Sequence, residues 1–486
     1  MKQPDIYTLK ELKQTDYTSL SVKQELRKNL IKALQNKEEL FPGIVGYENT
    51  VIPSLINSIL AGHDILLLGL RGQAKTRILR SLILFLDEWT PVIKGSVLNE
   101  DPLNPITSKS KALLDEYQDQ LPIEWLHRSD RFNEKLATPD VSMADLIGDI
   151  DPIKASREKL DLSHEDVINY GLIPKTHRGL FLINELPDLQ GRIQVGLLNI
   201  LEESDVQIRN FPVKLDLDLM MLFTANPEDY TNRGNIITPL KDRIASQILT
   251  HYPMERELAI NITEQEAKSY SELTVTIPSL YKHLIEEIAI QARHSEHIDQ
   301  TSGVSARLTI SAMELLFSNI EKRHLITGSD PIVRMTDLLA VIPAICGKVE
   351  LVYEGEQEGP HLIAEKIIGK AVKQLFEEHF PAIMSSKEGD QSDPMYQHIQ
   401  KWFSSGNSIT LTDHQSNETE LKQLEAIPGL SELITTYIQN IDRREMLSWM
   451  SFVIEALHQN ALLSREGSEG AWCYGDMLMN MLDDIN

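Results

Sequence analysis

The chain begins with a polar amphipathic segment and then alternates helical patterns with short apolar runs. Apolar positions at helical spacing predict a helical N-terminal segment over residues 1–40. Beyond it, helices and apolar runs alternate in the way typical of a parallel sheet with helices on both faces. Continuous apolar runs predict buried strands at 65–68, 180–183 and 219–224.

The second half of the chain has mostly helical periodicity. Residues 256–376 predict an all-helical lid, and residues 385–394, rich in Ser, Gly and Asp, are interpreted as a linker. Residues 380–486 contain 6 basic and 16 acidic residues, yet their apolar runs keep helical spacing. We therefore expect four parts: the N-terminal segment (1–40), an αβα core (41–255) with a mixed insertion at about 97–178, the lid (256–376), and an acidic, mostly helical C-terminal region (377–486).

Composition narrows the class of protein. The 486 residues are 42% hydrophobic and 24% charged, as in an ordinary folded chain. The formal net charge of −25 argues against a broad nucleic-acid-binding face, which requires basic residues. No apolar run is long enough to span a bilayer, and the N-terminus has no apolar signal segment, so we expect a cytoplasmic protein without membrane contact. The two cysteines form neither a zinc spacing nor a disulfide framework.

A glycine-rich turn follows the first predicted strand and leads into a helix. Its backbone N–H groups are expected to bind phosphate oxygens, Lys75 to reach the terminal phosphates, and the Thr76 hydroxyl to bind Mg²⁺. The expected nucleotide-binding residues are Gly69, Leu70, Arg71, Gly72, Gln73, Ala74, Lys75 and Thr76. Ala74 stands where a second glycine is usual, and its small side chain still allows a helix-type backbone there. The alternative is a tight strand–helix turn with a surface lysine.

Polar residues follow the other two predicted strands. Glu185 is placed to polarise an attacking water, and Asn184 stands where an aspartate usually helps to hold Mg²⁺. The alternative is a core strand that ends in a capped turn. Asn226 follows the strand at 219–224, and if that strand lies between the other two, its amide could orient the same water. Alone, the sequence Thr-Ala-Asn-Pro at 224–227 would be an ordinary turn.

Two arginines could stabilise the charge of a phosphoryl group in transit. Arg243 follows the third strand, and Arg307 opens a helix in the second half of the chain. Either residue alone could equally be a surface or helix-capping arginine.

Taken together in this order, these motifs resemble those of the AAA+ ATPases. The resemblance covers about residues 41–350 and is nearest to the ATPase (I) subunit of magnesium chelatase, with the MoxR-type ATPases as near relatives. Three further segments support it: Phe41–Gly46, Asp149–Pro152 followed by Gly171–Gly179, and Glu203–Leu215. Residues 351–486 resemble nothing that we can name.

The resemblance implies roles for single residues. Lys75 and Thr76 would bind ATP and Mg²⁺, Glu185 would be the catalytic acidic residue, and Asn226 would be sensor 1. Arg243 would be an arginine finger that reaches a neighbouring subunit, and Arg307 the lid's sensor 2. Asn184 departs from the family aspartate, and it brings no charge toward Mg²⁺ where the aspartate would.

The resemblance also implies partners. Members of this family form rings, usually hexamers, with nucleotide sites between subunits. No DxSxS metal motif occurs in this chain, so a metal-ion or substrate site of that kind would lie on a partner protein. The chain would then be an ATP-driven motor that remodels the partner or drives metal insertion into a substrate that the partner holds.

Other functions remain open at this point. A MoxR-type chaperone ATPase would use the same residues. A transcription activator or nucleic-acid motor is disfavoured because the GAFTGA loop and a helix-turn-helix pattern are absent and the tail is acidic. A nucleotide-gated scaffold with little hydrolysis stays possible because of Asn184.

Overall fold

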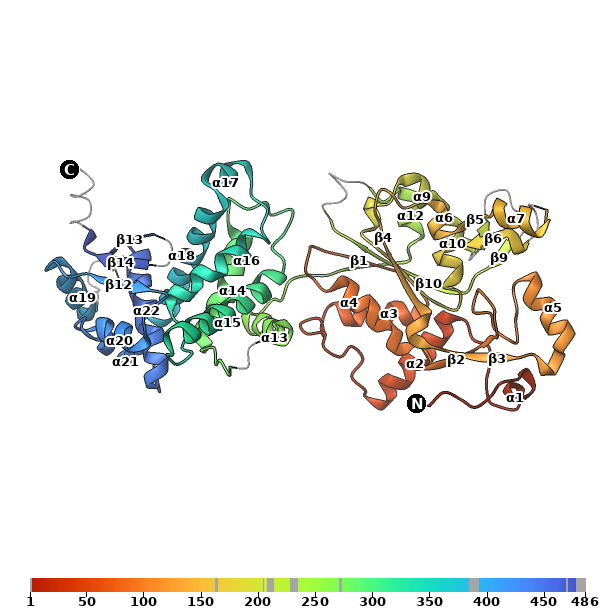
Figure 1. The fold of residues 1–486 in the computed structure, drawn as a ribbon, viewed down its shortest axis with the longest axis horizontal. Coiled ribbons are helices and arrows are strands. Elements are labelled where there is room, and N and C mark those ends of the chain that lie inside the picture. The colour runs from red at the N-terminus through yellow and green to blue at the C-terminus, as the bar shows by residue number, and fades with distance from the viewer. Residues whose placement is uncertain are drawn as a thin grey trace. The chain divides into compact units, whose positions relative to one another are not determined.

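The chain folds into two compact units, Met1–His251 (unit 1) and Tyr252–Asn486 (unit 2), which are drawn in Figure 1. The computed structural model describes residues 2–161, 165–203, 205–207, 214–227, 235–270, 273–383, 393–468 and 471–477. Most of the expected linker at 385–394 therefore lies outside the described residues.

Unit 1 is organised around a five-stranded parallel sheet in the order β11-β1-β10-β7-β4. Its strands are β1 (Ile65–Leu68), β4 (Phe132–Leu136), β7 (Gly179–Asn184), β10 (Leu219–Ala225) and β11 (Ser246–Leu249). The strands expected at 65–68, 180–183 and 219–224 are thus confirmed. The α/β fold expected from the alternating pattern is also confirmed.

Alternating side chains of the strands enter two separate hydrophobic cores, one on each face of the sheet. Leu180 and Leu182 pack with α2, α3 and α4, whereas Phe181 and Ile183 pack with the helices of the opposite face. All four side chains are buried. This two-sided burial explains why the strands appear in the sequence as continuous apolar runs.

The remaining elements of unit 1 flank this sheet or lie beyond its edges (Figure 1). Its helices are α1 (Leu9–Lys13), α2 (Val22–Asn36), α3 (Val51–Ala61), α4 (Lys75–Ser81), α5 (Ser108–Tyr117), α6 (Met143–Leu146), α7 (Pro152–Glu158), α8 (Leu172–Lys175), α9 (Gly191–Gly196), α10 (Leu198–Glu203) and α12 (Thr238–Arg243). Its other strands form three antiparallel pairs: β2 (Trp89–Ile93) with β3 (Ile123–His127), β5 (Gly148–Ile150) with β6 (Ile168–Tyr170), and β8 (Asp205–Gln207) with β9 (Lys214–Asp216).

The segment at 97–178 is not only an insertion, because it contains the edge strand β4. That strand was missed because its middle residues, Asn133, Glu134 and Lys135, are polar and give no apolar run. An edge strand tolerates such residues, since one of its sides is open. Glu134 forms an ion pair with Arg80 of α4 at 2.5 Å, which fastens the edge strand to the helix after the glycine-rich turn.

The N-terminal segment is an integral part of unit 1. Glu25 of α2 is 5% exposed and accepts two hydrogen bonds from the Arg131 guanidinium, at 2.7 and 2.6 Å. Arg131 also donates to the Arg178 carbonyl oxygen at 2.7 Å, just before β7. A buried bidentate pair of this kind fixes both position and orientation, so α2 is held against the start of the central sheet.

Unit 2 is helical with one small sheet. Its helices are α13 (Arg256–Glu266), α14 (Ser279–His294), α15 (Arg307–Thr327), α16 (Ile342–Cys346), α17 (Tyr353–Glu358), α18 (Pro360–His379), α19 (Pro394–Ser404), α20 (Asn417–Glu425), α21 (Leu430–Tyr437) and α22 (Arg443–Gln459), with a 3₁₀ helix, η6 (Met335–Val341). The expected helical lid is therefore confirmed as helix. The antiparallel sheet β12-β14-β13 (Ile409–Thr412, Ala471–Gly475 and Ser464–Ser468) was not expected.

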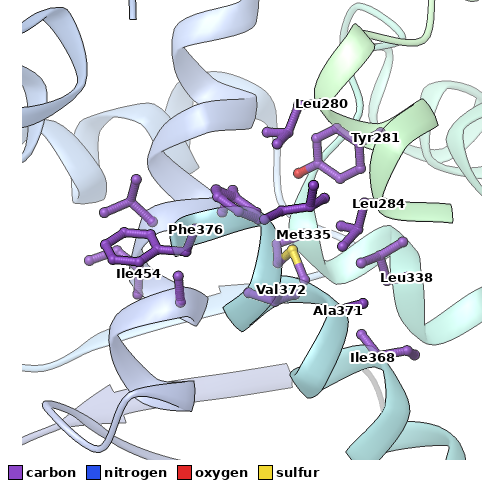
Figure 2. Close-up of a cluster of buried hydrophobic side chains, with 14 of the residues drawn as sticks. Leu280, Tyr281, Leu284, Met335, Leu338, Ile368, Ala371, Val372, Phe376 and Ile454 are labelled. Carbon is purple, nitrogen blue, oxygen red and sulfur yellow. The ribbon is translucent and has the colours of Figure 1, made fainter. Parts of the chain in front are cut away.

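One hydrophobic core runs through the whole of unit 2. Figure 2 shows side chains of α14, η6 and α18 packed together with Ile454 of α22. Helix α22 alone buries eleven residues. We expected a domain boundary at residue 377, but no separate core begins there, because the lid and the C-terminal region share one core.

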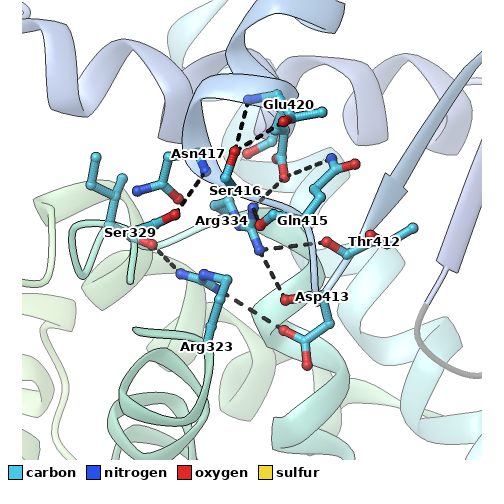
Figure 3. Close-up of polar contacts among 12 residues, drawn as sticks. Arg323, Ser329, Arg334, Thr412, Asp413, Gln415, Ser416, Asn417 and Glu420 are labelled. Carbon is cyan, nitrogen blue, oxygen red and sulfur yellow. Dashed lines mark hydrogen bonds and ion pairs between the residues drawn. The ribbon is translucent and has the colours of Figure 1, made fainter. Parts of the chain in front are cut away.

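Buried charges also join these two regions (Figure 3). Arg334, which is 0% exposed, forms an ion pair with Glu420 of α20 at 2.8 Å and donates to the carbonyl oxygens of Gln415 and Asp413. Arg323 of α15 pairs with Asp337. Burial raises the pKa of Glu420, and the Arg334 charge opposes that rise. The ion pair therefore has to remain intact for the carboxylate to stay charged inside the protein.

We expect Arg334→Met to destabilise unit 2 by about 3–5 kcal/mol, because it leaves the Glu420 carboxylate buried without its cation. The double variant Arg334→Met with Glu420→Leu should recover most of that loss, since it removes both charges. Hydrogen exchange of unit 2 peptides would measure both effects. Equal protection in the single variant and the wild type would show that the pair does not hold the two regions together.

Candidate functional site

The order of the strands brings three loops of unit 1 to one edge of the sheet. Strand β10 lies between β1 and β7 and pairs with both of them in parallel. The carboxyl ends of parallel strands meet at the same edge, where open α/β sheets bind ligands. The glycine-rich turn after β1, Asn184 and Glu185 at the end of β7, and Asn226 after β10 therefore lie together.

The glycine-rich turn is held closely against β10 and the end of β11. The Gly69 N–H donates to the Ala225 carbonyl oxygen at 3.2 Å. A Cβ atom on Gly69 would overlap the Thr250 hydroxyl and the Gln73 side-chain oxygen, so a larger residue would displace the hydrogen bond between these two side chains. Gly72 has a φ of +77°, a conformation that glycine adopts without strain.

Ala74 differs from the expectation. Its φ of 54° and ψ of 15° are left-handed, not the helix-type backbone that we expected, and α4 begins only at Lys75. The left-handed conformation costs a residue with a Cβ atom roughly 1–2 kcal/mol. The turn thus keeps the backbone that a second glycine would favour, at some cost in strain.

Lys75 closes the turn. Its Nζ donates to the carbonyl oxygens of Gly69 and Leu70, the latter at 2.8 Å, and to Asn226 Oδ1 at 2.7 Å. The ammonium group is thus held by three oxygens at the edge of the sheet. Asn226 is 9% exposed, so its amide has a defined position. Lys75 and Asn226, which lie 151 positions apart in the sequence and were both predicted as site residues, are therefore in direct contact.

A second set of hydrogen bonds joins α4 to β7 and β10. The Thr76 hydroxyl donates to Asn184 Oδ1 at 2.9 Å, and the Thr224 hydroxyl donates to the same oxygen at 3.2 Å. The Thr224 oxygen in turn accepts from the Glu185 N–H at 3.0 Å. Because Thr76 gives its proton to Asn184, the lone pairs of its oxygen remain available for another ligand.

The catalytic candidate Glu185 lies beside this set. Its side chain is exposed, and its backbone is left-handed, with φ 56° and ψ 49°. The Thr224 hydroxyl holds its backbone N–H, so the residue has a fixed place at the end of β7. Thr224, to which the sequence analysis gave no role, thus positions both Asn184 and Glu185.

Further positioning residues lie at the end of β11. The Thr250 hydroxyl donates to Gln73 Oε1 at 2.7 Å, and the Tyr47 hydroxyl contacts the carbonyl oxygens of Gln73 and His251, at 3.0 and 2.7 Å. These contacts hold the turn from the side opposite Asn226. Thr250 is a polar residue directly after a strand, which is the signal that identified Asn184 and Asn226.

The two arginines are not brought into this set by any contact that we observe. Arg243, the last residue of α12, forms an ion pair with Glu202 of α10 at 2.7 Å. Arg307, the first residue of α15, belongs to unit 2. Its side chain is exposed and makes no ion pair within the described part of the chain.

Mg²⁺ would need a bound nucleotide to complete its ligand set here. Among the described residues, no group of three or more His, Cys, Asp or Glu side chains could hold a metal ion by itself. Thr76 and Asn184 offer one free hydroxyl oxygen and one neutral amide. Phosphate oxygens would therefore have to supply most of the negative charge that Mg²⁺ prefers.

No model of a protein family matches the chain. Among solved structures, the chain is similar to NtrX from Brucella abortus in complex with ATP, with 13% identity, a TM-score of 0.35, and coverage of 75% of this chain and 62% of that one. It is also similar to the complex of subunits BchI and BchD of magnesium chelatase, with 16% identity, a TM-score of 0.34, and coverage of 66% and 98%.

A third similar structure is Hsp104 with ATPγS and casein, with 12% identity, a TM-score of 0.37, and coverage of 63% and 49%. The chain thus spans less than two thirds of the length of the NtrX and Hsp104 chains.

None of the described helices is long and apolar enough to cross a membrane. The cytoplasmic location stays a prediction.

Proposed function

We propose that unit 1 binds ATP with Mg²⁺ at the carboxyl edge of its sheet and hydrolyses it. The observation that carries this proposal is the convergence of Lys75 with Asn226, and of Thr76 with Asn184, in one network of hydrogen bonds. A surface lysine after a tight turn would have no reason to contact the buried amide that follows another strand. The alternative of a simple strand–helix turn therefore leaves this arrangement unexplained.

The residues present fit a nucleotide. The backbone N–H groups of residues 69–76 and the Lys75 ammonium would hold phosphate oxygens, and the Thr76 hydroxyl would contribute to holding Mg²⁺. Bound Mg²⁺ neutralises charge on the phosphate oxygens. Phosphates would replace the carbonyl oxygens that Lys75 now contacts, because the ammonium is attracted more strongly to an anionic phosphate oxygen than to a neutral carbonyl oxygen.

Glu185 and Asn226 are the residues that would act on water. The exposed Glu185 carboxylate would polarise the attacking water, and the Asn226 amide would orient it. Asn184 acts through Thr76, whose hydroxyl it holds, and it brings no charge of its own. We therefore propose that this chain hydrolyses ATP more slowly than ATPases that have an aspartate at this position.

At the level of the family, the proposal is an AAA+ motor of the magnesium chelatase I-subunit type. It would work as a ring, with a protein partner that holds the substrate or the metal. A MoxR-type chaperone ATPase, or a scaffold gated by nucleotide with little hydrolysis, is the alternative. Steady-state ATPase rates with and without candidate partners separate the motor from the scaffold, because only a motor gains turnover when its partner is present.

We expect Lys75→Ala to lower the affinity for ATP at least 100-fold while the fold survives, because Lys75 is the cation at the turn that bonds to Asn226. Titration with a fluorescent ATP analogue would measure the change, and circular dichroism would confirm the fold. Lys32→Ala, which removes an exposed charge from α2, is the matched control and should bind normally. Unchanged affinity in Lys75→Ala would refute the proposed nucleotide site.

We expect Asn184→Asp to lower the Mg²⁺ concentration that gives half-maximal ATPase activity, by about 3- to 10-fold. A carboxylate oxygen can accept the same two hydroxyl protons, and it adds a negative charge beside the Thr76 oxygen. Binding of nucleotide without Mg²⁺ should be unchanged or slightly weaker, since the new charge repels phosphate. Mg²⁺ titrations of the ATPase rate would test this, with Asn36→Asp on α2 as a charge control. An unshifted midpoint would show that Asn184 does not act on the metal.

We propose further that Arg243 acts on the nucleotide of a neighbouring subunit. In this chain Glu202 holds it, and a subunit contact would have to release it. Mixing inactive Arg243→Ala and Glu185→Gln subunits should then restore part of the ATPase activity, because some interfaces regain both residues. Glu202→Gln, which frees the arginine, should keep activity. Assembled mixtures as inactive as their parents would place the finger elsewhere.

A further inference from the structure

A second polar cavity lies at the other edge of the same sheet. Strands β7 and β10, which end at Asn184 and Ala225, are preceded by His177–Arg178 and by Asp218. These residues line a cavity of about 340 Å³ together with Asp101, Asp216 and the segment before α2. The cavity therefore lies at the amino ends of the strands, whereas the proposed nucleotide site lies at their carboxyl ends.

Two of the polar side chains that line this cavity, Asp101 and Arg178, already have hydrogen-bond partners within the protein. Asp101, which is 4% exposed, accepts from the hydroxyls of Tyr17 and Ser19 at 3.0 and 2.6 Å, and it lies 3.6 Å from the Arg178 guanidinium. Arg178 also donates to the Pro91 carbonyl oxygen at 2.6 Å. These residues form a rigid wall and have little capacity left for a ligand.

His177 is different, because one of its nitrogens has no partner. The ring is 4% exposed, and Nδ1 accepts from the Asp218 N–H at 2.9 Å, which places the proton on Nε2. Within the described part of the chain, no group accepts from this Nε2–H. Burial lowers the pKa of His177 to about 4, so the ring is neutral at pH 7 and remains a donor. This Nε2–H is therefore available to an acceptor on a ligand in the cavity.

Two further carboxylates of the cavity, Asp218 and Asp216, make no ion pair within the described part of the chain. Asp218 accepts from the Val22 N–H through both oxygens, at 3.0 Å each. Burial raises the pKa of Asp218, and this hydrogen bond and the charges of Arg178 and Arg131 oppose that rise. Asp216, at the end of β9, makes no ion pair within the described part of the chain, and neither does the exposed Lys111 that also lines the cavity. The open groups are thus two carboxylates, one ammonium and one imidazole N–H.

We propose that this cavity binds a small organic zwitterion of the amino-acid class. Its ammonium or guanidinium group would contact Asp216 and Asp218, and its carboxylate would accept from His177 Nε2–H and Lys111. The volume accommodates a molecule as large as arginine. This site does not depend on the proposed ATPase activity, since it shares no residue with the nucleotide site.

The test is calorimetric titration of the full chain with L-arginine, with agmatine, which lacks the carboxylate, and with acetate, which lacks the cation. L-arginine should bind saturably and at least 5-fold more tightly than agmatine, and acetate should not bind. Lys111→Ala should abolish the preference for arginine over agmatine. Asp216→Asn, which changes a side chain without a protein partner, should weaken arginine at least 10-fold. Asp115→Asn on α5 is the charge control and should bind as the wild type does.

The ¹⁵N resonance of His177 Nε2 provides a second readout that does not depend on stability. It should shift when L-arginine saturates the site. The proposal is overturned if 10 mM L-arginine gives no saturable binding, if Asp216→Asn binds as tightly as the wild type, or if the His177 resonance does not move. A free peptide that binds better than L-arginine through its N-terminus would assign the same chemistry to a protein partner.

Discussion

The parallel pairing of β10 between β1 and β7 is the constraint on which the rest of unit 1 depends. It places the turn after β1 beside residues that follow β7 and β10, although more than 100 positions separate them along the chain. Had β10 not paired with β1, Asn226 could not reach Lys75, and had it not paired with β7, Thr224 could not reach Asn184. The site is therefore a consequence of strand order, and the flanking helices keep that order by burying both faces of the sheet.

This arrangement holds the chemical groups ready before any ligand is present. Lys75, Asn226, Thr76 and Asn184 already make hydrogen bonds with one another or with the turn, so little side-chain ordering remains for nucleotide binding to supply. The turn itself stores some strain, since Ala74 is left-handed. Backbone strain of this kind persists where the surrounding contacts over-determine the conformation, and here Lys75, Gln73 and Thr250 provide such contacts.

The sequence predicted the parts of this site that are local. The apolar runs identified β1, β7 and β10, the glycine-rich turn after β1 identified Lys75, and the polar residues after the other two strands identified Asn184 and Asn226. It could not predict β4, whose polar middle residues make sense only for an edge strand beside β7. Nor could it predict the Arg243–Glu202 pair or the bridging role of Thr224, because these depend on which helices and strands become neighbours. The roles of the named residues in binding and hydrolysis stay predictions.

The same distinction explains unit 2. Its helical periodicity was visible in the sequence, but the shared core and the Arg334–Glu420 pair join segments that differ in charge and appeared to be separate regions. A buried ion pair adds little net stability compared with apolar packing, but it penalises any arrangement that separates its partners. Arg334 therefore adds little net stability, but it determines how the two regions pack: the acidic C-terminal region can pack on the lid only where Glu420 meets the arginine. The apolar side chains of α22 bury themselves in the shared core, and the Arg334–Glu420 pair fixes the place where the acidic region packs.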